Sequence, residues 1–152
     1  MLTAEMKQAV ADAKLCYVAT VSPDGTPNLS PKGSLEVWDD RHLVFANIAS
    51  PDTVRNLAKN PAIEINVLDP FARRGFRFKG TAQVLDSGPV FAKIAGDLLA
   101  RFGPSLPVHG AVLVEVQHAR PVVSPAYTFN PDATVDGVRR EWLAIYGVTP
   151  AR

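Results

Sequence analysis

Short apolar or alternating runs separated by turn-forming residues cover most of the chain and predict strands. These runs occupy residues 15–22, 28–38, 43–48, 62–69, 75–86 and 110–124. The second run is interrupted at 30–34, "SPKGS", because a proline removes a ladder donor and a glycine favours a bulge. The segment "PDGTP" predicts a tight turn between the first two strands. Six strands joined early by hairpins favour an antiparallel barrel over a parallel α/β sheet.

Helical spacing of apolar residues marks four other segments, which we expect to lie at the periphery of the barrel. Residues 3–14 have Thr3 available as an N-cap, and residues 89–103 and 133–146 are amphipathic. A fourth helix is predicted over 51–59, because Ser50-Pro51 is a preferred helix start. Its apolar face is expected to hold Val54, Leu57 and Ala58. We interpret residues 1–152 as one mainly β domain.

Composition and charge narrow the class of protein. Sixteen basic and fifteen acidic residues give a net charge of +1, which argues against a protein that coats nucleic acid. The single cysteine, Cys16, excludes an intramolecular disulfide, and no Cys/His spacing indicates a metal site. The amino end is charged and no apolar run reaches the length of a membrane span. We therefore expect a cytoplasmic protein without nucleic-acid or membrane partners.

Three features indicate a local anion site. The helix start at Ser50 to Thr53 offers unpaired N–H groups and two hydroxyls, although a plain helix cap is the commoner explanation. The segment "FARRGFRFKG" (71–80) carries four basic residues and no acid. Strand alternation would place Phe76 and Phe78 in the core and Arg77 and Lys79 outside, where a solubilising face is the alternative. Because acids are absent from the segment, we expect these cations not to be neutralised by surface ion pairs.

Lys32 supplies the third feature, because it lies in the irregular "SPKGS" segment, where Gly33 permits the close approach of a ligand. Together, the kinked strand, the helix start and the basic strand predict a phosphate-bearing ligand laid across the barrel.

The chain resembles the FMN-binding split β-barrel proteins related to pyridoxamine 5′-phosphate oxidase, above all their small FMN-binding members. The likeness covers about residues 10–120 and depends on the order "YVATVSPDGTPNLSPKGSLEVWDDRHLVFANIASPDTVRNLAKNPAIEINVLD" followed by "GFRFKGTAQVLDSGPVFAKI". It implies a six-stranded antiparallel split β-barrel of Greek-key type. It also implies a homodimer with FMN sites at the interface.

The resemblance assigns expected FMN contacts residue by residue. The kinked strand and the end of the third strand match family positions that contact the flavin ring and the ribityl chain. The helix start and the basic strand match family positions that contact the phosphate. These residues are Ser30, Pro31, Lys32, Gly33, Ser34, Ala46, Asn47, Ile48, Ser50, Thr53, Arg74, Arg77 and Lys79. No catalytic side chain is required, because the flavin carries the redox chemistry.

Two departures from the oxidases proper argue against vitamin B6 oxidation. Their Arg-Lys pair at the helix start is replaced here by Pro51, Asp52 and Thr53, and the final segment "REWLAIYGVTPAR" lacks their basic substrate-binding character. Trp142 and Tyr146 are four residues apart on the predicted last helix. They could pack in the core or at an interface, or they could cover the flavin; we expect packing. The three histidines are expected to be structural or surface residues.

Three functions therefore fit the sequence. The first is an FMN-dependent oxidoreductase with an unknown small-molecule substrate. The second is an FMN-binding electron-transfer protein that works with a redox partner. The third is a relative that uses another ligand, the deazaflavin F420 or haem, although no histidine is placed persuasively as an axial haem ligand.

Overall fold

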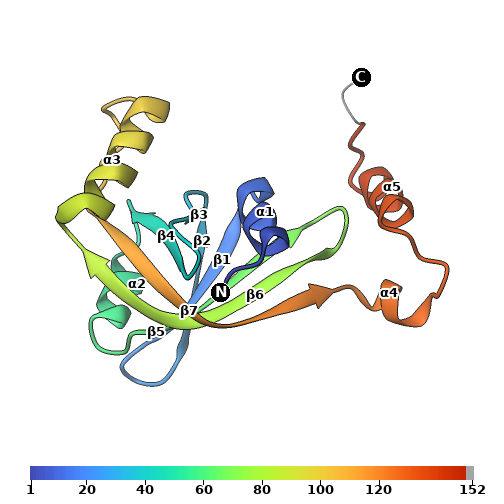
Figure 1. The fold of residues 1–152 in the computed structure, drawn as a ribbon, viewed down its shortest axis with the longest axis horizontal. Helices are drawn as coiled ribbons and strands as arrows, with labels where there is room; N and C mark the ends of the chain where they lie inside the picture. The colour runs from blue at the N-terminus through green and yellow to red at the C-terminus, as the bar shows by residue number, and fades with distance from the viewer. Residues whose placement is uncertain (150–152) are drawn as a thin grey trace.

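Seven antiparallel strands form one curled sheet in the computed structural model, which describes residues 1–149 (Figure 1). The strands are β1 (Cys16–Val21), β2 (Pro27–Lys32), β3 (Glu36–Val37), β4 (His42–Asn47), β5 (Ala62–Asp69), β6 (Arg74–Leu85) and β7 (Gly110–Val123). Their order across the sheet is β2-β1-β5-β6-β7-β4-β3. The mainly β, split-barrel expectation is therefore confirmed.

The strand count differs from the predicted six because the second predicted strand divides in two. β2 pairs with β1 at one edge of the sheet, whereas β3 pairs with β4 at the opposite edge. The segment "SPKGS" is thus no bulge within one strand: Ser30, Pro31 and Lys32 remain paired with β1, and the chain crosses from one edge to the other over residues 33–35. The two edge strands, β2 and β3, do not pair with each other, so the barrel is split between them.

The concave side of the sheet encloses the main core. Phe45 and Phe78 are fully buried there, and Val18 and Ile65 lie beside them with no exposed surface. A second cluster lies on the other side of β4, where Val44 and Ala46 pack against helix α3 (Gly88–Phe102). β4 is consequently buried on both faces, and for that reason it reads in the sequence as a continuous apolar run.

Helix α1 (Ala4–Asp12) packs on the barrel as expected, and the Thr3 hydroxyl accepts a hydrogen bond from the Met6 N–H. Helix α2 is shorter than predicted and ends at Leu57. Its predicted apolar face was wrong in part: Leu57 is buried as predicted and Val54 is half-buried, but Ala58 is exposed, and Thr53 and Asn56 are buried in addition. Asn56 is buried because its side-chain amide donates hydrogen bonds to the hydroxyls of Thr20 in β1 and of Ser22 just after it.

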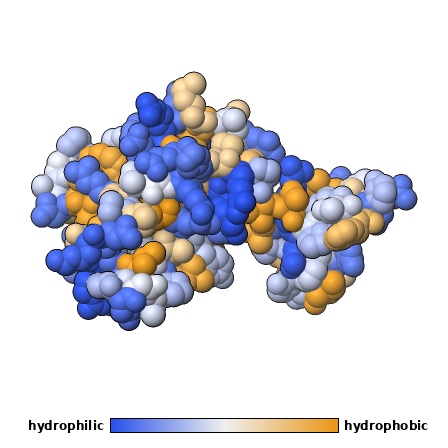
Figure 2. Space-filling view, turned by 90° about the horizontal axis from the view of Figure 1, so that it is seen from below, coloured by the Kyte–Doolittle hydropathy of each residue, from blue (hydrophilic) through white to orange (hydrophobic). Residues whose placement is uncertain are grey.

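A small lobe beyond β7 contains α4 (Pro125–Phe129), which the sequence did not predict, and α5 (Val135–Ile145), within the predicted range 133–146. The lobe stands off from the barrel (Figures 1 and 2). It is tied to the β5–β6 turn, where Arg139 donates a 2.7 Å hydrogen bond to Asp69 and the Arg73 guanidinium lies 4.0 Å from the centre of the Trp142 ring.

Among the described residues, no helix combines the length and the apolar character needed to cross a membrane.

Candidate functional site

A buried lysine, Lys32, lies at the split in the barrel, which we call the opening. Lys32 ends β2 and is only 6% exposed, although lysines are rarely buried without a partner. Its ammonium group donates hydrogen bonds to the hydroxyls of Ser30 and, at 2.7 Å, of Ser50. It also lies 5.9 Å from the centre of the Phe45 ring. Lys32 therefore bridges the two edges of the split, from β2 to the segment that follows β4.

The positive charge of Lys32 has no negative partner in the described part of the chain. None of the ion pairs there involves Lys32, and its hydrogen-bond acceptors are uncharged. Cys16 lies directly opposite Lys32 in the β1–β2 ladder, but burial raises the pKa of the Cys16 thiol to about 11, against the opposing effect of Lys32. The thiol is thus neutral at neutral pH. Burial likewise lowers the pKa of Lys32 from its usual value.

The side chain of Ser50 does not cap the helix that follows it. It occupies the N-cap position of α2 with Pro51 at the first helical position, yet its side chain makes no capping hydrogen bond. The hydroxyl instead accepts a hydrogen bond from Lys32. The commoner explanation for a Ser-Pro helix start is therefore wrong here, because the buried cation attracts the hydroxyl oxygen.

The other residues predicted to line the opening differ in their contacts and their burial. The Ser34 hydroxyl accepts a 3.0 Å hydrogen bond from the Ala46 N–H, which is a second bridge across the split. Ala46 is fully buried, and Ile48 packs with it in the cluster beneath α3. Asn47 is half-buried at the end of β4, and Pro31 is exposed on the opposite face of β2 from Lys32.

The predicted basic strand lies on the other face of the sheet. Phe76 and Phe78 enter the core as predicted, and Arg77 lies in a cross-strand row with Asn66 and Tyr17 on the outer face. Lys32 instead lies in the inner row, opposite Cys16. The structure thus brings Lys32 together with Ser30 and Ser50, but not with Arg77 and Lys79.

The expectation that these basic residues lack ionic partners was wrong. Glu64 on β5 lies between them, 2.7 Å from Arg77 Nε and 3.1 Å from Lys79. Arg74 likewise lies 3.2 Å from Glu5 of α1. An acid-free segment of sequence cannot exclude ion pairs, because the neighbouring strand in space supplies the acid.

Sequence reasoning missed a polar cluster near α2. The Thr20 hydroxyl accepts 3.1 Å hydrogen bonds from the side-chain amides of both Asn28 and Asn56. Thr53, a predicted phosphate contact, is only 2% exposed on the same helix. The signal was present in the alternation of β1 and β2, which places Thr20 and Asn28 on the same inward-facing side as Ser30 and Lys32.

The aromatic pair of α5 lies in the lobe rather than in the core. The Trp142 and Tyr146 rings are 6.1 Å apart, and Tyr146 is 58% exposed. Tyr146 also meets Phe71 of the β5–β6 turn edge to face at 5.9 Å. These contacts fix α5 against the hairpin and leave part of the aromatic surface exposed.

Comparison with known proteins agrees with the split-barrel fold. A family model described as pyridoxamine 5′-phosphate oxidase matches residues 2–124. The HupZ protein of Group A Streptococcus is 31% identical, with a TM-score of 0.74 over 82% of this chain and 96% of that one.

Two more distant structures share the fold. An FMN-binding protein of Syntrophomonas wolfei is 19% identical, with a TM-score of 0.72 over 81% of this chain and 87% of that one. An F420 reductase is 22% identical, with a TM-score of 0.61 over 78% of this chain and 98% of that one.

Proposed function

We propose that this chain, which belongs to the pyridoxamine 5′-phosphate oxidase family, binds FMN at the opening of the barrel and acts as an oxidoreductase on a small molecule. The observation that carries the proposal is Lys32, a cation buried between two hydroxyls without a carboxylate in the described residues. An uncompensated buried charge costs several kcal/mol, about 3–5 kcal/mol when a partner is removed. An anionic ligand at Lys32 would offset that cost.

The residues at the opening fit a flavin nucleotide. FMN carries a phosphate and, at one edge of its ring, oxygen and nitrogen atoms that accept hydrogen bonds. Lys32, Ser30 and Ser50 provide a cation and two hydroxyls for such a group. We assign anion recognition to these three residues in preference to Arg77 and Lys79, whose charges are already shared with Glu64.

A bound flavin supplies the electron transfer that no side chain here performs. The chain's own contribution is electrostatic and steric. Lys32 favours negative charge on any group held beside it, because the surrounding core lowers the local dielectric. Phe45 and the buried wall of β4 exclude water from one side of the opening.

The substrate is proposed to differ from pyridoxamine phosphate. The helix start presents Pro51 and an Asp52–Arg55 ion pair where the oxidases carry two basic residues. An electron-transfer role without a substrate, and binding of a deazaflavin in place of FMN, are the alternatives. The fold shared with an F420 reductase supports the second alternative.

A visible absorption spectrum tests the cofactor directly. We expect protein purified without added cofactor, or loaded with FMN and desalted, to retain a flavin spectrum with shifted bands. Bovine serum albumin treated identically controls for carry-over. A colourless protein that loses FMN on desalting contradicts FMN binding, and retention of a deazaflavin by the same protein then favours the alternative.

We further propose a homodimer formed through the outer face of β1 and β2. Tyr17 is 45% and Leu29 65% exposed on this face, which is unusual for a solvated sheet. Pro27 and Pro31 lie on the edge strand β2 and lack the N–H groups that edge-to-edge pairing requires. A second copy would therefore dock on the face and not on the edge.

Replacing Leu29 by glutamate is expected to weaken such a dimer at least about tenfold, because a charge would replace apolar surface at its centre. Light scattering after size-exclusion chromatography, over a range of concentrations, measures the change. Phe129→Glu, at an 83% exposed position of α4, is the matched control. A wild-type protein that is monomeric throughout, or a Leu29→Glu dimer as tight as wild type, contradicts this assignment.

A further inference from the structure

A groove lies beside the kinked segment, and Ser30, Lys32 and Ser50 are not part of its lining. It measures about 650 Å³ and runs between α1, the β2–β3 crossing and the last turn of α3. Ala11, Lys14, Gly33, Leu35, Val37 and Arg101 are among the residues that line it. We call this feature the α1 groove. Its volume lies within the range of about 300–1,000 Å³ typical of small-molecule sites.

The floor of the α1 groove is apolar and fixed. Leu35 and Val37 are partly buried and pack against the main core, and Ala13 of the α1 wall does likewise. At Gly33 a side chain would meet nothing closer than the Lys14 carbonyl oxygen at 3.6 Å. The absence of a side chain at Gly33 therefore leaves real space in the groove.

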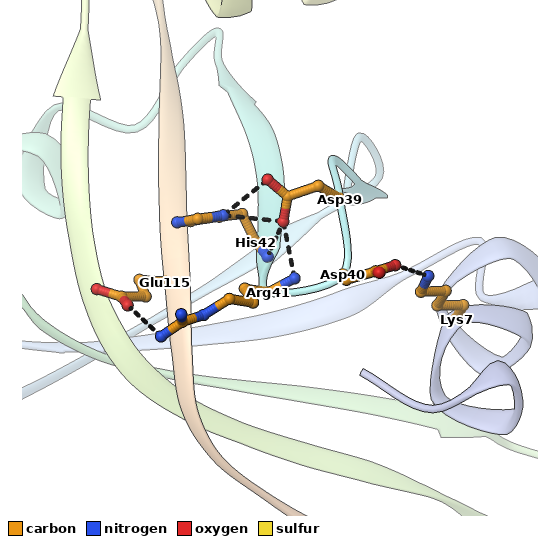
Figure 3. A network of polar contacts seen from close by, with 6 residues as sticks. All are labelled: Lys7, Asp39, Asp40, Arg41, His42 and Glu115. Atoms are coloured by element: carbon orange, nitrogen blue, oxygen red, sulfur yellow. Dashed lines mark hydrogen bonds and ion pairs between the residues drawn. The ribbon is translucent and has the colours of Figure 1, made fainter. Parts of the chain in front are cut away.

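The cations at the rim of the groove differ in whether they already have a partner. Lys7 lies 2.5 Å from Asp40 of the β3–β4 turn (Figure 3). This turn is itself fixed, because Asp39 accepts hydrogen bonds from the backbone N–H groups of Arg41 and His42. Lys7 thus links α1 to the β3–β4 turn, and its charge is paired with Asp40.

Lys14 and Arg101 face the groove without an ion pair among residues 1–149. The Lys14 ammonium reaches only the Ala11 carbonyl, at 3.4 Å, and the Arg101 guanidinium lies 4.9 Å from the Phe102 ring. Glu36 is the acid of the lining, and Lys93 of α3 pairs with Asp97 rather than with it. The groove therefore combines an apolar floor with two cations that have no ion pair within the described range, Lys14 and Arg101, against one acid, Glu36.

We propose that the α1 groove binds a small amphipathic anion, with a flat or aliphatic body on Leu35 and Val37 and a carboxylate, sulfonate or phosphate between Lys14 and Arg101. Gly33 follows Lys32 directly, so the groove and the Lys32 site adjoin the same kink of the chain. Its use as the substrate site rests on the proposed flavin function. The binding of the anion does not.

Titration of 1-naphthoate into the full-length, ¹⁵N-labelled protein, flavin-free and flavin-loaded, tests the proposal by amide chemical shifts. We expect saturable shifts at Lys14, Gly33 and Leu35. The double variant Lys14→Gln/Arg101→Gln should bind at least tenfold more weakly, whereas Lys59→Gln/Arg140→Gln, which removes two exposed cations outside the groove, should bind as wild type does. The neutral 1-naphthamide should bind weakly and equally to all three proteins.

Two further measurements separate the possible failures. Ala11→Trp should fill the groove from the exposed face of α1 and abolish naphthoate shifts without changing the oligomeric state. Any of three results overturns the proposal. The first is shifts confined to residues outside the groove, and the second is equal affinity of the wild type and the double variant. The third is a change of oligomeric state in Ala11→Trp, because a second copy would then occupy the groove. If the protein binds naphthoate through Lys14 and Arg101 but retains no flavin, the proposal of an anion site in the α1 groove stands. Only its role as the substrate site is then overturned.

Discussion

Replacing Lys32 by glutamine is expected to weaken FMN binding about 10- to 100-fold, because charge-assisted hydrogen bonds contribute about 1.5–3 kcal/mol each. Glutamine keeps hydrogen-bonding capacity and a similar length but removes the buried charge beside Ser30 and Ser50. The reduction potential of flavin that remains bound should also fall, since the reduced ring is anionic and loses a neighbouring cation. Fluorescence titration gives the affinity, and equilibration with redox dyes gives the potential.

Lys59→Gln is the matched control, because Lys59 is exposed after α2 and contributes no group to the opening. It should leave both affinity and potential unchanged. If Lys32→Gln folds normally and also leaves both quantities at the wild-type values, the cofactor does not contact Lys32. Removal of the charge alone is expected to stabilise the flavin-free protein, so a variant that simply fails to fold is not the expected outcome.

Replacing Phe78 by alanine is expected to lower the free energy of unfolding by about 3–5 kcal/mol. Phe78 is 1% exposed, belongs to the main core and lies opposite Ile65 and Ala119 in the ladders of β6. Removing the ring leaves a cavity that the neighbouring strands cannot close, because their positions are set by hydrogen bonding on both sides of β6. Urea denaturation followed by circular dichroism measures the loss.

Phe129→Ala makes the same chemical change at a side chain that is 83% exposed, and it should alter stability by less than about 0.5 kcal/mol. Comparable losses in both variants would show that the inner face of the sheet is not the stabilising core. At the same time, the Phe78 variant should bind flavin with wild-type affinity wherever it remains folded, since Phe78 does not line the opening.

Local patterns in the sequence predicted most of the elements correctly. The Thr3 cap, the turn at "PDGTP" and the inward Phe76 and Phe78 depend only on neighbours in the chain, and all are as expected. The errors about charge and capping arose where the partner lies far away in the sequence. Glu64 neutralises the basic strand from β5, and Lys32 removes Ser50 from its expected capping role.

What the sequence alone determined is most of the strands and helices, the inward face of β6 and the presence of cations near the kink, because periodicity and turn chemistry are local. The tertiary structure decided which of those cations lie together. The chain crosses between the sheet edges over residues 33–35, so the split lies between β2 and the β3–β4 edge, and Lys32 reaches Ser50 eighteen residues later. Pairing between strands places Arg77 on the opposite face. No local pattern contains that information, because strand order is set by the packing of the whole sheet.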